Sequence, residues 1–432
     1  MNNHIIKVAE MFAGVGGFHL GLSRASRDFK VVWADQYEPS RKNQFAFNIY
    51  RHNFPETNIV NDDIEKVVKS DIPDINLLVG GFPCQDYSVA SSSAKGLFGK
   101  KGVLWWDIRD VVKAKFPQFI LLENVDRLLA SPGVTSKQPG RDFGMILRTL
   151  ADLGYCVSWK MINAADYGFP QRRRRTFIFA ARKDTAYYSE LRASTIHGEA
   201  SVGAYIKGMA PLSSGMKIDS LDTVHKVDLY RYQSLSEFSD KFSYKKGFRR
   251  TGMMVAGQVY MANYEAVKKT QTNLGSVIRP NNPDNNLWLR GERLARMKQM
   301  KSGFQMTKTS RRGDYTYRYG MGDMRFPDSL ELPARTMVTS EHTISRMSHV
   351  IQDPGNHEYR LLSPEETEQI NTFPAGWTEL EGVSNPQRYF TMGNALVVNL
   401  VRDIGKEIDK LARQEPHLTK FNPNSAVENV EH

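Results

Sequence analysis

KVAEMFAGVGGFHLGLSRA, residues 7–25, is the stretch that decides the fold. Its first six residues form a short apolar run of the kind found in buried strands, and its last ten have the spacing of a helix. Between them, Gly14 and Gly16 allow a tight turn, in which backbone N–H groups at the start of a helix can approach a ligand closely. The stretch therefore predicts a strand, a glycine turn and a helix, in that order.

The same alternation of strand and helix continues to about residue 183. After the first run at residues 7–12, further runs at residues 30–35, 58–63, 75–81 and 119–125 are each followed by a helical stretch. This spacing predicts a doubly wound, mostly parallel α/β sheet with helices on both faces, in which ligands bind beyond the carboxyl ends of the strands. After residue 183 the rhythm ends, but aliphatic and aromatic residues persist. We therefore expect a second, smaller and irregular domain there rather than disorder.

The composition favours a nucleic-acid partner. The 432 residues carry a net charge of +11, and between residues 290 and 318 there are nine Lys or Arg against two acids, with aromatic residues between them. Such an excess attracts polyanions, although a basic solvated surface is the alternative for each residue. Arg290, Arg293, Arg311 and Arg312 are candidate DNA contacts.

Other classes of protein find little support in the composition. Two cysteines are too few for a disulfide framework, and the ten histidines show no paired ligand spacing, so we expect no metal site. No apolar stretch approaches the roughly eighteen residues of a membrane span, and the N-terminus does not read as a secretion signal. We expect a cytoplasmic protein with no membrane association.

Two aspartates follow the first glycine turn at successive strand ends. Asp35 ends the second apolar run and could accept a ribose hydroxyl, and Asp63 ends the third and could accept an adenine amino group. Each could instead be only a helix N-cap. A dinucleotide fingerprint starting at Gly14 would need glycine at position 19, where His19 stands, which argues against a nicotinamide enzyme. The pattern favours a nucleoside ligand without a pyrophosphate.

The segment GGFPCQDYSVA, residues 80–90, carries Cys84 just beyond the fourth strand. A thiolate there could act as a nucleophile, whereas Cys156 is expected to be a buried structural residue. Glu123 ends the next strand, where a carboxylate is costly unless it has a function. Strand alternation would place Arg173 and Arg175 on one face. A thiol, an acid and guanidinium donors suit cytosine, which can be attacked at C6, protonated at N3 and held at O2.

These motifs resemble the cytosine-5 DNA methyltransferases. FAGVGG, GGFPCQDYS, ENV, QRRRR, RLLSPEETEQINTFP and MGNAL occur in that family's order and at its approximate spacing, over residues 1–183 and about 330–412. The resemblance implies a class I, Rossmann-like fold. It also implies transfer of a methyl group from S-adenosylmethionine to C5 of a flipped-out cytosine in a specific duplex sequence, through a covalent bond between Cys84 and C6. A tRNA cytosine-5 methyltransferase and an inactive DNA-binding protein on the same scaffold are the alternatives.

The resemblance also implies roles for individual residues. Cys84 would be the nucleophile, Glu123 would hold N3 and the exocyclic amine, and Asn124 would steady the cysteine segment. Arg173 and Arg175 match the arginines of QxRxR, one of which meets O2. The cofactor would contact Phe12, Gly14, Gly16, Asp35, Gln36, Asp63, Ile64, Pro83, Leu104 and Asn394. Four residues depart from the usual pattern: Asp35 stands for a longer Glu, Gln36 for an aromatic residue, Glu10 for an Asp, and Glu365 for a basic residue.

The domains are expected as follows. Residues 1–183 form the catalytic and cofactor-binding domain, completed by residues 386–412; residues 184–385 form the target-recognition domain and return segment; residues 413–432 form a flexible tail. Double-stranded DNA is the expected partner of a monomeric chain in the bacterial cytoplasm, where it would associate with the nucleoid. A cognate restriction endonuclease acting separately is expected by family association alone.

Overall fold

The computed structural model of the chain describes residues 4–82, 104–132, 138–213, 217–282, 284–309 and 314–415. The chain divides into two compact units. Unit 1 comprises Met1–Asn163, Arg174–Val267 and Asn399–His432, and unit 2 comprises Ala164–Arg173 and Lys268–Val398. Among the described residues, no helix is both long and apolar enough to cross a membrane.

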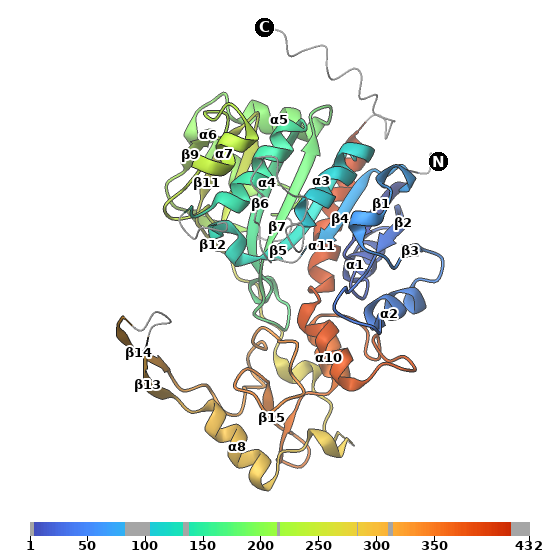
Figure 1. The fold of residues 1–432 in the computed structure, drawn as a ribbon, viewed down its shortest axis with the longest axis vertical. Helices are drawn as coiled ribbons and strands as arrows, with labels where there is room; N and C mark the ends of the chain where they lie inside the picture. The colour runs from blue at the N-terminus through green and yellow to red at the C-terminus, as the bar shows by residue number, and fades with distance from the viewer. Residues whose placement is uncertain are drawn as a thin grey trace. The chain divides into compact units, whose positions relative to one another are not determined.

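Unit 1 is built on a sheet of ten strands in the order β3-β2-β1-β4-β5-β7-β6-β10-β11-β9 (Figure 1). The strands are β1 (Ile6–Met11), β2 (Phe29–Asp35), β3 (Asn58–Val60), β4 (Leu77–Gly81), β5 (Phe119–Val125), β6 (Tyr155–Asn163), β7 (Arg174–Arg182), β9 (His225–Asp228), β10 (Thr251–Val255) and β11 (Gln258–Ala262). Neighbours among the first five strands are parallel. From β5 onward, every neighbouring pair is antiparallel. A short separate pair, β8 (Ile218–Leu221) and β12 (Tyr264–Ala266), completes the strands of this unit.

Helices cover this sheet on both faces. They are α1 (Gly17–Ala25), α2 (Phe45–Asn53), α3 (Leu104–Lys115), α4 (Arg141–Asp152), α5 (Ala186–Ser194), α6 (Glu199–Gly208), α7 (Leu235–Lys241) and α11 (Val398–Gln414). From β1 the chain crosses to β2 on one side, and from β4 to β5 on the other, so right-handed crossovers put α1 and α3 on opposite faces. Ile108 of α3 and Ile146 of α4 share a buried core with Ile120 and Trp159 of the sheet. The predicted doubly wound α/β fold is confirmed.

The compact units divide the chain differently from the domains expected from the sequence. Residues 184–267 belong to unit 1, because β10 pairs with β6 and is followed by β11 and β9, which extend the central sheet. Residues 386–398 belong to unit 2, and only residues from 399 onward return to unit 1. The strands of this extension, β8 to β11, are only four or five residues long and pair antiparallel, and helices separate only some of them, so the regular strand–helix alternation of the first 183 residues is missing.

Unit 2 contains α8 (Gly291–Lys301), α9 (Pro364–Ile370), α10 (Asn385–Asn394) and the strand pairs β13 (Phe304–Thr309) with β14 (Thr316–Met321) and β15 (Val350–Gln352) with β16 (Tyr359–Leu361). α9 begins at Pro364, which suits a first helical turn, and it has a capping box between Ser363 and Glu366. Arg360, fully buried, bonds to Asp353 (2.7 Å) and to both oxygens of Glu366 (2.8 Å each). A buried charge is tolerated only when it is paired in this way, so these residues specify how the segments of unit 2 join.

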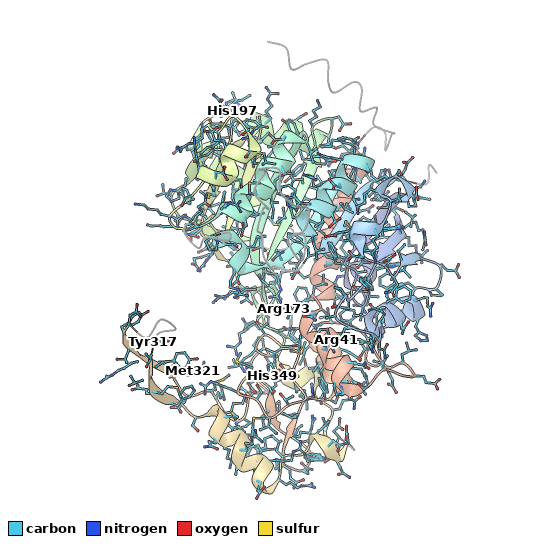
Figure 2. All side chains as sticks on the ribbon, in the orientation of Figure 1. Arg41, Arg173, His197, Tyr317, Met321 and His349 are labelled. Carbon is cyan, nitrogen blue, oxygen red and sulfur yellow. The ribbon has the colours of Figure 1, made fainter. Side chains whose placement is uncertain are left out.

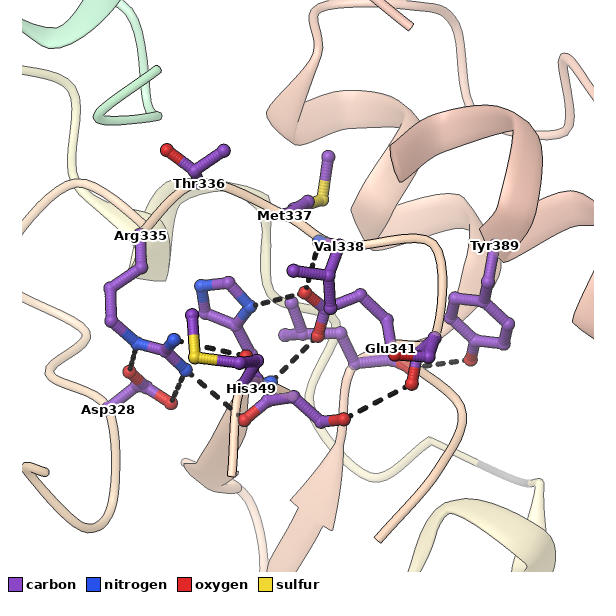
Figure 3. Close-up of polar contacts among 12 residues, drawn as sticks. Asp328, Arg335, Thr336, Met337, Val338, Glu341, His349 and Tyr389 are labelled. Atoms are coloured by element: carbon purple, nitrogen blue, oxygen red, sulfur yellow. Dashed lines mark hydrogen bonds and ion pairs between the residues drawn. The ribbon is translucent and has the colours of Figure 1, made fainter. Parts of the chain in front are cut away.

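A second buried network holds the loop before β15 (Figure 3). Glu341 accepts bonds from the Val338 N–H (2.9 Å), the His349 N–H (2.7 Å) and the His349 ring (3.1 Å). Burial alone would raise the pKa of the Glu341 carboxyl, but the His349 ring and these donors lower it below its ordinary value. Arg335 bonds to Asp328 (2.8 Å), whose other oxygen receives the N–H of Val350 (2.9 Å).

Candidate active site

The glycine turn after β1 has the backbone shape that the sequence predicted. Phe12, Gly14 and Gly16 all have positive φ angles, of 54°, 57° and 84°. The Ala13 N–H donates to the Asp35 carbonyl (2.9 Å) and the Gly16 N–H to the Ala13 carbonyl (2.9 Å). Gly16 then caps the N-terminus of α1. The turn thus connects the end of β1 to the end of β2 and leads into a helix N-terminus.

Gly16 is required by close packing as well as by its φ angle. A Cβ at this position would lie 2.4 Å from Cε2 of Phe54, whose ring stacks on His19 with centroids 3.6 Å apart. At Gly14, by contrast, a Cβ would meet nothing within 4 Å.

We expect Gly16→Ala to lower the free energy of unfolding by about 2–4 kcal/mol, because left-handed strain and overpacking act together. Gly14→Ala is the matched control, since it adds the strain alone, on the order of 1–2 kcal/mol. Urea denaturation of the three proteins measures both values. Equal losses in the two variants would contradict the role of the Phe54 contact.

Glu10 of β1 is an acid buried close to the start of α1. It is fully buried and accepts a hydrogen bond from the Tyr50 hydroxyl (3.1 Å). Burial raises the pKa of this carboxyl to about 8. The backbone groups of Phe18 and His19, in the first turn of α1, lower this pKa, but by less than burial raises it.

Asp35 and Gln36 lie together at the end of β2. Asp35 is buried, the Phe12 N–H donates to it over a long 3.4 Å, and burial raises its pKa to about 7. Gln36, buried beside it, accepts the Gly14 N–H through its side-chain oxygen (2.6 Å). From the sequence, Gln36 was both a cofactor candidate and a departure from the family pattern, and in the structure it supports the glycine turn.

Three further cofactor candidates, Asp63, Ile64 and Leu104, have structural contacts of their own. Asp63 is half-buried and caps the short helix Ile64–Lys66, accepting the Glu65 N–H (3.2 Å), as the structural alternative from the sequence proposed. Ile64 is buried in the main core, and Leu104 begins α3 and packs against that core. Pro83 and Cys84 lie outside the described residues.

Glu123 and Arg175 meet on neighbouring strands. Arg175 lies opposite Val125 in the antiparallel pairing of β5 with β7, and therefore on the same face as Glu123. Its Nε lies 2.8 Å from the Glu123 carboxylate, and both side chains are partly exposed, by 17% and 13%. Gly81, at the end of β4, is opposite Glu123, and a Cβ there would lie 3.4 Å from that carboxylate. The glycine leaves the carboxylate uncrowded.

Asn124 holds the chain where it leaves β4. Its side chain is buried and donates to the Phe82 carbonyl (2.8 Å), while its own oxygen accepts the Val125 N–H (2.8 Å). Phe82 is two positions before Cys84. The amide therefore fixes the backbone that leads to the cysteine segment.

In unit 2, the QRRRR and MGNAL segments are joined by buried polar groups. Arg173, which is labelled in Figure 2, is buried, and its guanidinium donates to the Gly393 carbonyl (3.1 Å). Gln171 donates to Asn371 (2.7 Å), and Asn371 donates to the Met392 carbonyl (2.8 Å). Gln171 and Asn371 had no assigned role in the sequence, although both lie within the quoted motifs. Asn394, at the end of α10, is exposed.

Arg173 and Arg175 belong to different units, and β7 begins only at Arg174. The alternation that predicted a shared face holds only inside a strand, so it does not apply to Arg173. Arg175 has the carboxylate partner, and Arg173 has a backbone carbonyl.

Comparisons with known proteins identify the family and the fold of the chain. A family model described as C-5 cytosine-specific DNA methylase matches residues 6–410. Among solved structures, a mutant DNMT2 from Spodoptera frugiperda aligns with a TM-score of 0.58 and 14% identity, covering 95% of this chain and all of that one. Dnmt2 from S. pombe aligns with a TM-score of 0.55 and 14% identity, covering 94% and 99% of the two chains. These likenesses show the fold, which is the class I, Rossmann-like methyltransferase fold expected from the sequence.

Curated relatives narrow the class further. The chain is 40% identical over 411 residues to the type II methyltransferase M.Sau3AI of Staphylococcus aureus, covering 94% of this chain and 96% of that protein. It is 36% identical over 183 residues to the type II methyltransferase M.NlaIV of Neisseria lactamica, covering 41% and 42%. The chain belongs to the C-5 cytosine-specific DNA methylase family and is a DNA cytosine-5 methyltransferase, the first of the activities considered from the sequence.

Proposed function

We propose that this enzyme uses S-adenosylmethionine to methylate C5 of a cytosine flipped out of a specific duplex sequence, through a bond between Cys84 and C6, as a restriction–modification methyltransferase. The observation that carries the proposal is the ion pair of Glu123 and Arg175 (2.8 Å). A carboxyl group and a guanidinium side by side match one edge of cytosine, where N3 and the exocyclic amine lie beside the carbonyl oxygen O2.

The residues at the ends of β1 and β2 fit a nucleoside cofactor. Asp35 offers a buried carboxyl with one long backbone bond, and a carboxylate can accept several hydrogen bonds, so it suits the two ribose hydroxyls. Gly14 leaves open space at the turn. We assign the ribose to Asp35, adenine to Phe12 with Asp63 and Ile64, and further contacts to Gly16, Pro83, Leu104 and Asn394. Gln36 would act indirectly, by orienting the Gly14 N–H.

Each catalytic side chain has one part in the proposed reaction. The Cys84 thiolate forms the S–C6 bond, and the electron pair of the ring double bond moves toward C5 and N3. Glu123 meets N3 with a proton or a hydrogen bond and Arg175 donates to O2, so the two hold the charge that moves onto the ring. The bound sulfonium donor supplies an electrophilic methyl group for C5. Water then takes the C5 proton, the electron pair of the C5–H bond re-forms the C5–C6 double bond, and the thiolate leaves C6.

Base flipping accounts for the need for DNA contacts outside this constellation. A cytosine inside a duplex cannot be reached, and swinging it out costs a few kcal/mol of stacking and pairing. Phosphate contacts by the basic side chains would offset that cost. Duplex DNA is the proposed substrate; action as a monomer, a separate cognate endonuclease and a location on the nucleoid in the bacterial cytoplasm remain predictions.

Two experiments test the activity directly. Bisulfite sequencing of DNA from cells that express the gene should reveal one methylated sequence. Transfer of tritiated methyl groups from S-adenosylmethionine should label duplex DNA containing that sequence and leave tRNA unlabelled. Labelling of tRNA alone, or of neither nucleic acid, would contradict the proposal.

Cofactor binding should depend on pH through Asp35. Because the pKa of this carboxyl is raised to about 7, the group is mostly protonated at pH 6 and mostly ionised at pH 8. The ionised form accepts the ribose hydroxyls, so the dissociation constant for S-adenosylmethionine should be about tenfold higher at pH 6 than at pH 8. Isothermal titration calorimetry measures both values. Asp35→Asn is the control and should bind weakly with little pH dependence; the same dependence in both proteins would contradict the assignment.

A further inference from the structure

The hairpin of β13 and β14 is a ribbon that buries neither of its faces. Ten of its twelve strand residues are exposed, and the other two, Lys308 and Tyr319, are half-buried. These two contact each other, with the ammonium 3.7 Å from the ring centroid. Figure 1 shows the ribbon as an arm beyond the end of α8, and Figure 2 labels Tyr317 and Met321 on it. A two-stranded hairpin with no covered face is at best marginally stable by itself, so this one is suited to a partner.

The register separates the ribbon into two chemically different faces. Phe304 pairs with Met321, Met306 with Tyr319 and Lys308 with Tyr317, which puts the large apolar and aromatic side chains together. Gln305 pairs with Gly320, Thr307 with Arg318 and Thr309 with Thr316 on the opposite face. We name this second set, Gln305, Thr307, Thr309, Thr316 and Arg318, the polar face. All five side chains are exposed.

The base of the ribbon is held firmly although its faces are free. Arg346 donates to the carbonyl of Ser302 (2.8 Å), just before β13, and to that of Gly322, just after β14. The Gly303 N–H donates to Asp323 (2.6 Å) across the same base. Lys301, buried at the end of α8, donates to the Ser348 carbonyl (2.5 Å). The polar face is therefore presented from a rigid support.

We propose, resting on the proposed function, that the ribbon enters the major groove of the target duplex and that its polar face reads base edges. The major groove admits a two-stranded β-ribbon. Arg can bond to guanine and Gln to adenine through two hydrogen bonds each, and Thr can contact either a base edge or the thymine methyl group. The polar face offers these three side-chain types in one row.

The positive charge of the ribbon and its surroundings favours DNA over a protein as the partner of the ribbon. Neither strand of the ribbon contains a carboxylate, and the surrounding stretch from 290 to 318 has nine basic residues against two acids. A surface of this sign is attracted to phosphates. The apolar face carries one basic residue, Lys308. Lys308 serves as a matched control for Arg318, because the two residues have the same charge and lie on opposite faces of the same ribbon.

The experiment compares Arg318→Ala and Gln305→Ala with Lys308→Ala in the full chain. The recognised site is first defined by bisulfite sequencing of DNA methylated by the wild-type enzyme. We expect each polar-face variant to lower kcat/KM on that site by about 10- to 100-fold, the scale of one lost two-bond base contact, and to methylate sites that differ at one base pair. Its affinity for a random duplex should fall less than about threefold. Lys308→Ala should lower the affinity for the recognised duplex and for the random duplex by the same factor, and it should leave the methylated sequence unchanged.

Other outcomes separate the ribbon proposal from the proposed methyltransferase function. If the wild-type enzyme methylates a defined site and Arg318→Ala and Gln305→Ala keep its rate and sequence profile, the ribbon proposal is wrong and the activity stands. An altered sequence profile in Lys308→Ala alone would also overturn the ribbon proposal, because the apolar face rather than the polar face would then contact the bases. A wild-type enzyme that methylates no duplex DNA would overturn both. Among the described residues, no side chain of the ribbon belongs to the hydrophobic cores of the two units. All three variants should therefore melt at the wild-type temperature, which circular dichroism verifies.

Discussion

Cys84→Ser should abolish methyl transfer while leaving DNA binding within about twofold of the wild type. A neutral hydroxyl is a far weaker nucleophile than a thiolate, and loss of an essential nucleophile lowers turnover by on the order of 10⁴-fold or more. Single-turnover transfer of tritiated methyl groups, together with a gel-shift measurement of DNA affinity, tests both parts of this expectation.

The covalent step has a separate readout. On duplexes with 5-fluorocytosine at the target base, fluorine cannot leave as a proton does, so the wild-type enzyme should form a denaturant-stable adduct and Cys84→Ser should form none. The other cysteine supplies the control. Cys156 is fully buried in β6 and donates to the Ala181 carbonyl (3.4 Å), so Cys156→Ala should keep both turnover and adduct. Substantial methylation by Cys84→Ser would remove this residue from its proposed role.

Glu123→Gln is expected to have the second largest effect, lowering kcat by about 10²–10⁴-fold, the usual contribution of a general acid or base. Glutamine keeps an oxygen that can accept from Arg175 but cannot donate or receive a proton at N3. KM for DNA should therefore change little, because the substitution removes an interaction that strengthens as the thiol adds to the ring. Steady-state kinetics on the cognate duplex measures the division between kcat and KM.

A matched variant distinguishes this role from a structural one. Glu190→Gln removes an exposed carboxylate on α5 and should leave kcat unchanged. If Glu123→Gln were merely structural, its melting temperature would fall together with its activity. An unchanged kcat in a folded Glu123→Gln protein would exclude the proposed contact with N3.

Several features of this enzyme were readable from residue order. The strand–turn–helix pattern of residues 7–25 and its repetition to about 183 predicted the parallel half of the sheet, because strand and helix periodicities are local properties of the chain. A tight turn at Gly14 and Gly16 was predicted because glycine permits it, and the motif order predicted the family.

Other features depend on contacts between distant residues, which a local pattern does not contain. The pairing of β10 with β6 brought residues 184–267 into unit 1, and the contact of Gly14 with Gln36 explained a residue that had looked like a departure. The ion pair of Glu123 with Arg175 joins strands 52 positions apart in sequence. The two faces of the ribbon needed the strand register, since moving the pairing by one residue would exchange every facing side chain. Local periodicity thus determined which elements form, and only tertiary pairing decided which side chains meet.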